Sequence, residues 1–408
     1  MTMINIIVTI LILFSPTSNA ITKTKPLPFK KIYAFGDSFT DTGNTRLGAG
    51  PSTFNYGFKP PYGVTFFHHP TNRYSDGRLV IDFVAQSLSL PFLPPYKNVK
   101  RNSPNGVNFA VAGSTAINHR FFVKNNLTLN ITPQSIKTQF RWFNKYLKKN
   151  VGCKTQDRNC RIADFKDTLF WIGEIGVNDY AYTIGSTISS DTIRKLGIKS
   201  YSQFLTIPVS TTYPMVSYCY CFKKKKEKEK SHCSCIVLIL QALLKKGAKY
   251  VVVQGFPMSG CLPLAMTLAS QDDRDNIGCV KSVNNQSYTH NLAILKLVKS
   301  LRTQFPQAVI IYADYWTAYK TVMQSPAKFG MKETFKACCG TGGPYNLDVF
   351  SVCGTPSVRA CRNPSQYVNW DGVHLTEGMY KVVSDMFLKG SLTQPSFNYL
   401  LAKKLHHG

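Results

Sequence analysis

Short apolar runs alternate with stretches of helical periodicity along most of the chain. Runs rich in Val, Ile, Phe and Tyr predict β-strands at 31–35, 107–110, 168–172, 250–254 and 308–312. Apolar residues spaced three and four apart predict amphipathic helices, most clearly in the stripes that begin at Ile136, Ile294 and Met379. Strands that alternate with helices are typical of an α/β protein, and the sequence favours one domain over residues 27–400.

One segment interrupts this pattern. Residues 206–240 contain two prolines, four cysteines and a run with six Lys and two Glu, which no single helix or strand accommodates. Without them Leu205 joins Gln241, and the sequence from Ile198 to Gly247 becomes one helix that ends at a glycine cap. We interpret 206–240 as an aberrant insertion, from a retained intron or a gene-model error. A long surface loop is the alternative, although structureless loops of this length are uncommon in compact domains.

The N-terminus predicts secretion. Residues 5–14 form a short apolar run, and Ser18-Asn19-Ala20 resembles a cleavage site, so we interpret residues 1–20 as a signal peptide. The apolar run is too short to span a membrane. Secretion also agrees with the twelve cysteines, since disulfides persist in oxidising compartments. Three sequons predict N-glycosylation, at Asn126, Asn130 and Asn285.

Cysteine spacing predicts some disulfides and leaves others open. Close spacing suggests that Cys153 pairs with Cys160 and that Cys261 pairs with Cys279. A later group contains Cys338, Cys339, Cys353 and Cys361, for which the sequence allows three connectivities.

The net charge of +28 arises from 49 basic and 21 acidic residues. The segment 206–240 contributes little of it, so most of the excess belongs to the rest of the chain. A basic secreted protein suits an acidic polysaccharide or an anionic lipid surface, while dispersed, solvated lysines are the simpler alternative. A nucleic-acid partner is not expected, because no aromatic and basic recognition motif accompanies the charge.

Candidate chemistry begins directly after the first predicted strand. Gly36 permits a sharp bend there, and Asp37-Ser38 follows at the strand's carboxyl end, where ligands bind in open α/β sheets. Near the other end of the chain, Asp371 and His374 lie three residues apart, so one turn holds both side chains together. A serine hydroxyl needs a base, and an imidazole oriented by a carboxylate supplies one.

Two further loops complete the pattern. Gly113 and Ser114 end the run Asn-Phe-Ala-Val-Ala-Gly-Ser, and Asn178 lies in Gly-Val-Asn-Asp after the strand at 168–172. With the serine turn and the Asp-x-x-His motif, these blocks resemble the GDSL esterase/lipases, the plant branch of the SGNH hydrolases, over residues 31 to 390.

The resemblance implies a three-layer α/β/α sandwich with a mostly parallel, flavodoxin-like sheet, and a secreted carboxylic ester hydrolase of the cell wall or apoplast. It makes Ser38 the nucleophile, His374 the base and Asp371 its orienter. It assigns the oxyanion hole to the Ser38 and Gly113 N–H groups and the Asn178 amide. Glu174 and Asp179 flank Asn178, and either could orient that amide. Asp76 and Arg78 are expected to clamp their loop by an ion pair.

No metal or organic cofactor is implied. The expected substrate is an acyl ester, whether a lipid, an aryl ester or an acylated polysaccharide. Acyl transfer to an alcohol and deacetylation of wall polysaccharide use the same residues and remain alternatives. A catalytically inactive wall-binding protein with the same fold is another alternative.

Overall fold

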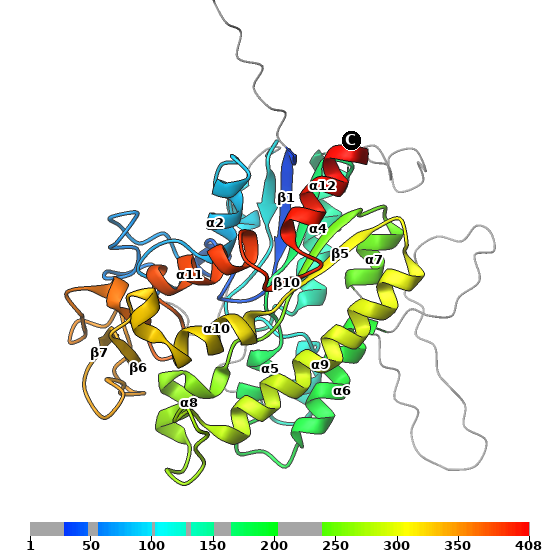
Figure 1. Cartoon of the computed structure of the whole chain (residues 1–408). Coiled ribbons are helices and arrows are strands. Elements are labelled where there is room, and N and C mark those ends of the chain that lie inside the picture. The colour runs from blue at the N-terminus through cyan, green and yellow to red at the C-terminus, as the bar shows by residue number, and fades with distance from the viewer. Residues whose placement is uncertain are drawn as a thin grey trace, which may run out of the picture.

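A six-stranded sheet forms the centre of the computed structural model, which describes residues 28–47, 56–99, 103–127, 132–150, 165–202 and 239–407 (Figure 1). The signal peptide, Asn130 and the Cys153–Cys160 pair lie outside these residues. Strand order is β10-β5-β4-β3-β1-β2. The strands are β1 (Lys31–Phe35), β2 (Gly106–Asn108), β3 (Thr168–Ile172), β4 (Tyr250–Gln254), β5 (Val309–Ala313) and β10 (Thr393–Gln394).

The sheet has the order 2-1-3-4-5 of a flavodoxin-like fold, with one added edge strand. β1 to β5 pair in parallel and only β10 runs antiparallel, against β5. The five strands predicted from sequence are therefore confirmed, within two residues at their ends. Each central strand is buried on both faces, which explains why its residues are almost all apolar.

Helices cover both faces of the sheet (Figure 1). One face packs against α2 (Val80–Ser87), α10 (Tyr315–Gln324), α11 (Glu377–Leu388) and α12 (Phe397–His407). The other packs against α4 (Ile136–Asn150), α6 (Ser190–Ser202), α7 (Ile239–Lys245) and α9 (Lys281–Gln304). Alternate residues of each strand enter the two cores: Ile32 faces one and Tyr33 the other. The three-layer α/β/α prediction is confirmed.

Shorter elements surround the carboxyl edge of the sheet. They are α1 (Asn44–Leu47), α3 (His119–Lys124), α5 (Val177–Ala181) and α8 (Pro263–Leu268), with β6 (Glu333–Ala337), β7 (Cys339–Gly340), β8 (Arg359–Ala360) and β9 (Tyr367–Asn369). In the described ranges, no helix is both long and apolar enough to cross a lipid bilayer.

Three disulfides occur in the described part of the chain. Cys261–Cys279 is bonded as predicted. The later group resolves into Cys338–Cys361 and Cys339–Cys353, so neighbouring cysteines take separate partners.

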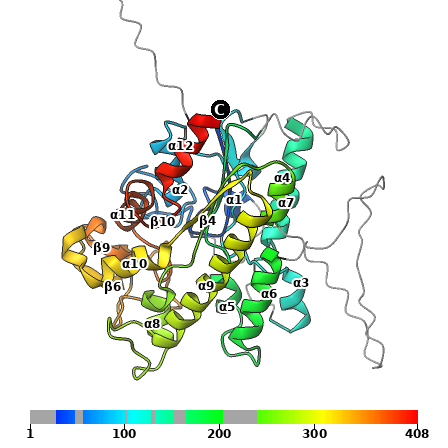
Figure 2. The ribbon, with the colours of Figure 1, turned by 45° about the vertical axis from the view of Figure 1, so that its right-hand side comes forward.

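The helices on either side of the 206–240 segment are neighbours in space. α6 and α7 contact each other, and both lie along α9 (Figure 2). Ser190 accepts a hydrogen bond from Gln286, and Gln241 donates one to Gln304. Gly247 lies two residues beyond the end of α7, and its φ of +97° suits the predicted glycine cap. Most of 206–240 lies outside the described residues, so the insertion remains a hypothesis.

Candidate active site

The predicted site residues gather where β1 and β3 end. These two strands are neighbours, but the chain leaves β1 toward β2 on one side and β3 toward β4 on the other. Such a reversal of strand order opens a crevice at the carboxyl edge of a parallel sheet. Ser38 follows β1 and Asn178 follows β3, so both loops meet at this crevice.

The turn that carries Ser38 is fixed by buried hydrogen bonds. Gly36 has φ of +148°, a conformation that favours glycine, and a Cβ there would lie 3.2 Å from the Glu174 carbonyl oxygen. Asp37 Oδ1 accepts the Phe39 N–H at 3.0 Å, which closes the turn around the serine. Ser38 itself is only 3% exposed. The turn is therefore rigid before any substrate binds.

Gln139 also fixes this turn, and it was not among the residues predicted from sequence. This α4 residue is fully buried; its Oε1 accepts the Gly36 N–H at 3.0 Å, and its Nε2 donates to the Gly36 carbonyl at 2.7 Å and to Ser114 Oγ at 2.8 Å. It ties the nucleophile turn to the Gly113-Ser114 loop. The available signal was a polar residue inside the apolar stripe of its helix, between Ile136 and Phe140.

Asp371 and His374 form the predicted pair. His374 Nδ1 lies 2.8 Å from Asp371 Oδ2, and Asp371 Oδ1 accepts the N–H groups of Val373 and His374 at 2.8 and 2.7 Å. Burial acts to raise the pKa of Asp371, but the charge of His374 and these hydrogen bonds outweigh it and lower the pKa to about 2. The ionised Asp371 can only accept a hydrogen bond, so Nδ1 keeps its proton and donates it to this carboxylate, which leaves Nε2 as the basic nitrogen.

The imidazole lies beside the serine turn. Its ring centroid is 5.6 Å from that of Phe39 and 4.8 Å from that of Tyr74, and its charge acts on Asp37. Both chain neighbours of Ser38 thus interact with His374. Nε2 is buried and has no hydrogen-bond partner among the described residues. It is a free proton acceptor next to the turn that carries the serine hydroxyl.

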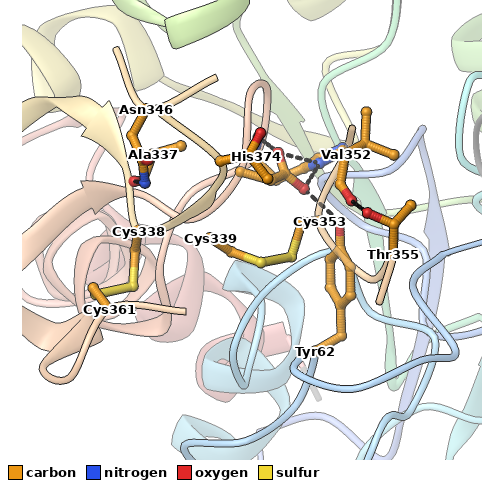
Figure 3. The surroundings of a disulfide bond; sticks show 12 residues. Tyr62, Ala337, Cys338, Cys339, Asn346, Val352, Cys353, Thr355, Cys361 and His374 are labelled. Carbon is orange, nitrogen blue, oxygen red and sulfur yellow. Dashed lines mark hydrogen bonds and ion pairs between the residues drawn. A yellow bond between two sulfur atoms is a disulfide. The ribbon is translucent and has the colours of Figure 1, made fainter. Parts of the chain in front are cut away.

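A tyrosine completes the surroundings of Asp371. The Tyr62 hydroxyl donates to Asp371 Oδ2 at 2.8 Å, beside the Cys339–Cys353 disulfide (Figure 3). Burial and the Asp371 carboxylate raise the pKa of Tyr62 well above its ordinary value, so the phenol keeps its proton and donates. The sequence alone does not identify Tyr62, because nothing near it in the chain points to a partner more than 300 residues away.

We expect Tyr62→Phe to lower kcat roughly tenfold, because a hydrogen bond to a charged group contributes about 1.5–3 kcal/mol. KM should change little, since the phenol orients Asp371 and does not touch the substrate. The acid limb of the kcat/KM profile should move to higher pH, since a carboxylate with one donor fewer attracts the imidazolium more strongly. Stopped assays across pH test this. An unchanged profile would show that Tyr62 only fills space.

The candidate oxyanion donors lie at the same carboxyl edge of the sheet. The N–H groups of Ser38 and Gly113 donate to no other group in the described ranges, and Gly113 takes φ of +73°. Asn178 is half-buried at the start of α5, but its Nδ2 donates to Asp37 Oδ2 at 2.9 Å and to the Ser114 carbonyl at 3.0 Å. Two backbone donors are therefore free, while the amide must share or release one N–H to bind an oxyanion.

Asp179 has a structural role beside the amide. Its two oxygens accept the N–H groups of Ala116 and Ile117 at 2.8 and 2.7 Å, which attaches α5 to the Gly113-Ser114 loop. Burial raises its pKa to about 7 despite these bonds. Within the described ranges, the Asp179 carboxylate makes no hydrogen bond to the Asn178 amide.

The predicted ion pair between Asp76 and Arg78 is wrong. Arg78 instead pairs with Glu377 at the first turn of α11, while Asp76 accepts the Glu377 N–H at 2.7 Å and a hydrogen bond from Thr65. Both residues therefore attach their loop to α11, just after His374. The short spacing between Asp76 and Arg78 is misleading here, because Arg78 pairs with Glu377, which is distant in sequence.

The predicted glycosylation sites Asn126 and Asn285 are exposed, the first after α3 and the second on α9. In the described residues, no group of three or more His, Cys, Asp or Glu side chains is arranged to hold a metal ion.

Comparison with known proteins shows the family of the chain. The family model for GDSL-like lipase/acylhydrolase matches residues 32–387. A GDSL esterase/lipase of Arabidopsis thaliana is 55% identical over 405 residues, which cover 97% of this chain and 96% of the relative. Acetylajmalan esterase 2 of Rauvolfia serpentina is 36% identical, over 87% of this chain and 88% of the relative. The chain therefore belongs to the GDSL-like lipase/acylhydrolase family, a family of carboxylic ester hydrolases.

Proposed function

We propose that the chain hydrolyses esters through a Ser38–His374–Asp371 triad. Ser38 Oγ attacks the ester carbonyl while His374 Nε2 takes its proton. The alcohol leaves with that proton, and water activated by His374 then releases the acid from Ser38. The Ser38 and Gly113 N–H groups and the Asn178 amide stabilise the oxyanion; deleting one such donor typically costs about 10²- to 10³-fold in rate.

One observation carries the proposal. The hydrogen bond from His374 Nδ1 to an ionised Asp371 leaves Nε2 free beside the serine turn. A buried imidazole in this state is suited to general-base catalysis, and it lies next to a serine at a strand end with two unused N–H donors. A purely structural role would not explain why His374 Nε2 and the N–H groups of Ser38 and Gly113 are all left without hydrogen-bond partners in the described ranges.

A serine-directed fluorophosphonate tests the assignment. Ser38 should displace fluoride and become covalently labelled, which mass spectrometry of the peptide locates. Labelling should disappear in His374→Ala. Folded wild-type protein without label would support an inactive wall-binding protein. Product analysis with added alcohols separates hydrolysis from acyl transfer.

The acyl group of the substrate is proposed to be small. The relative from Rauvolfia serpentina carries the name acetylajmalan esterase 2, which denotes removal of an acetyl group, and it aligns over most of this chain. Rates with a series of aryl esters of increasing acyl length should fall from the acetyl ester onward. A maximum at long chains would indicate a lipase instead.

The compartment proposed for the protein is extracellular. An apolar N-terminus, disulfides and exposed sequons at Asn126 and Asn285 all agree with passage through the secretory pathway. The net charge of +28 suits residence on acidic wall polysaccharide or an anionic lipid surface. Fractionation of tissue that expresses a tagged chain tests this location.

Residues 206–240 are proposed to be dispensable. Their deletion joins Leu205 to Gln241 and places a leucine where the fully buried Leu240 lies, so α6 and α7 become one helix along α9. We expect the shortened protein to keep wild-type kcat and KM and to melt at the same or a higher temperature, because a long insertion has an entropic cost of ordering its ends. Loss of folding on deletion, or a mature transcript that retains these codons, would contradict the insertion hypothesis.

A further inference from the structure

Two carboxyl groups lie together directly behind the nucleophile. Asp37 precedes Ser38, and Glu174 follows β3. The two residues are 1% and 0% exposed, and their carboxyl groups lie within reach of a hydrogen bond to each other. An ionised carboxylate has only acceptor oxygens, so this bond requires a proton on one of the two acids.

The surrounding donors decide which acid holds the proton. Asp37 accepts the Phe39 N–H on Oδ1 and the Asn178 amide on Oδ2, at 3.0 and 2.9 Å. Glu174 accepts the Val177 N–H on Oε1 at 3.0 Å, but its buried Oε2 has no donor among the described residues. Because donors stabilise the charged form, Asp37 is the carboxylate and Oε2 of Glu174 carries the proton.

Electrostatics agree with this assignment. Burial, then the charge of Asp37, raises the pKa of Glu174 well above its ordinary value. Burial also raises the pKa of Asp37, but the hydrogen bonds from Glu174 and the Phe39 N–H oppose it and the value stays at about 6. At neutral pH the pair therefore carries one negative charge, located on Asp37.

We propose that Glu174 is a positioning residue for the oxyanion hole, acting as a neutral acid that donates to Asp37 so that Asp37 holds the Asn178 amide. This inference rests on the proposed role of Asn178. Asp37 fixes one N–H of the amide, and the other points to the Ser114 carbonyl beside Gly113, where the oxyanion would bind. Without the Glu174 proton, two adjacent carboxylates would repel each other and the anchor of Asn178 would move.

Two substitutions separate a proton donor from a charged group. Glu174→Gln keeps an N–H donor for Asp37 and an oxygen for the Val177 N–H, and it can never ionise. Glu174→Ala removes both. We expect kcat close to wild type in Glu174→Gln, and about 10- to 100-fold lower in Glu174→Ala with KM nearly unchanged, because misplacing an oxyanion donor affects the transition state more than the bound substrate.

Infrared spectroscopy gives a readout independent of activity. Wild-type protein should show the carbonyl stretch of a protonated carboxylic acid, and Glu174→Gln should lack it. The band should therefore appear in the difference spectrum of wild type minus Glu174→Gln. The measurement is made above the pKa of about 7 of the buried Asp179, so that this neighbour is ionised and does not contribute.

The outcomes are distinct. Loss of kcat in Glu174→Gln as deep as in Glu174→Ala, wild-type kcat in Glu174→Ala, or no protonated-acid band in wild type would each overturn the inference. If Glu174→Ala does not fold, Glu174→Gln and the infrared band still decide. Absence of fluorophosphonate labelling at Ser38 in wild type would refute the proposed function, whereas the band reports the Glu174 proton in either case.

Discussion

Replacing Ser38 with Ala is expected to lower kcat for a short-chain aryl ester by about 10⁴- to 10⁶-fold, the usual range when a triad nucleophile is removed. The only atom lost is the Oγ that attacks the carbonyl. Ser38 sits in a turn whose shape depends on Gly36, Asp37 and Gln139, and none of their hydrogen bonds uses the serine hydroxyl. The fold should therefore survive, as an unchanged near-ultraviolet circular dichroism spectrum would show.

Ser384→Ala is a matched control for this experiment. Ser384 is buried to a similar degree, but it lies on α11 and donates to the Tyr380 carbonyl, outside the crevice. It should retain wild-type turnover. Substantial activity in Ser38→Ala would remove this residue from the mechanism, and equal losses in both variants would indicate general damage rather than a missing nucleophile.

Asp371→Asn is expected to reduce kcat by about 10⁴-fold at neutral pH, because an amide can present an N–H to Nδ1 and stabilise the wrong tautomer of His374. The remaining acceptor oxygen can still bind the Val373 and His374 N–H groups, so the local turn should persist. Steady-state kinetics measure the loss. Asp385→Asn, at a partly exposed acid that pairs only with lysines, is the control.

The same substitution predicts a change in the pH dependence of stability. The folded-state pKa of Asp371 is about 2, below its ordinary value of 3.8, so the ionised form contributes stability above about 4 that is lost as the pH falls toward 2. As the pH falls through this window, the melting temperature of wild-type protein should therefore decrease more than that of Asp371→Asn. If the melting temperatures of the two proteins decreased equally with pH, the Asp371 carboxylate would not be stabilised by His374.

Local patterns predicted those features whose causes are local. The strands appear in the sequence because both faces of a buried parallel sheet require apolar residues, as in β4. Asp371 and His374 could be paired because three residues of one turn separate them. The bend at Gly36 could be predicted because a sharp bend directly after a strand favours glycine.

The remaining features depend on contacts between distant parts of the chain. Tyr62 reaches Asp371, and Gln139 reaches Gly36, across separations that no periodicity encodes. The sequence leaves Glu174 and Asp179 as equal candidates to orient Asn178, and the proposal for Glu174 rests on its proximity to Asp37, at the end of another strand. Cysteine pairing in the later group likewise follows from strand placement rather than spacing.

The two adjacent disulfides should make the activity of the enzyme depend on the redox conditions in which it folds. The N–H groups of Cys338 and Cys339 bond to the carbonyls of Asn369 and Trp370, immediately before Asp371. A chain produced in a reducing cytosol would lack the crosslinks that hold these cysteines in place, and its acid–base pair would lose its support while the distant sheet could still form. Preparations that are folded but contain reduced thiols should therefore have a lower specific activity, and a titration of free thiols would measure that fraction.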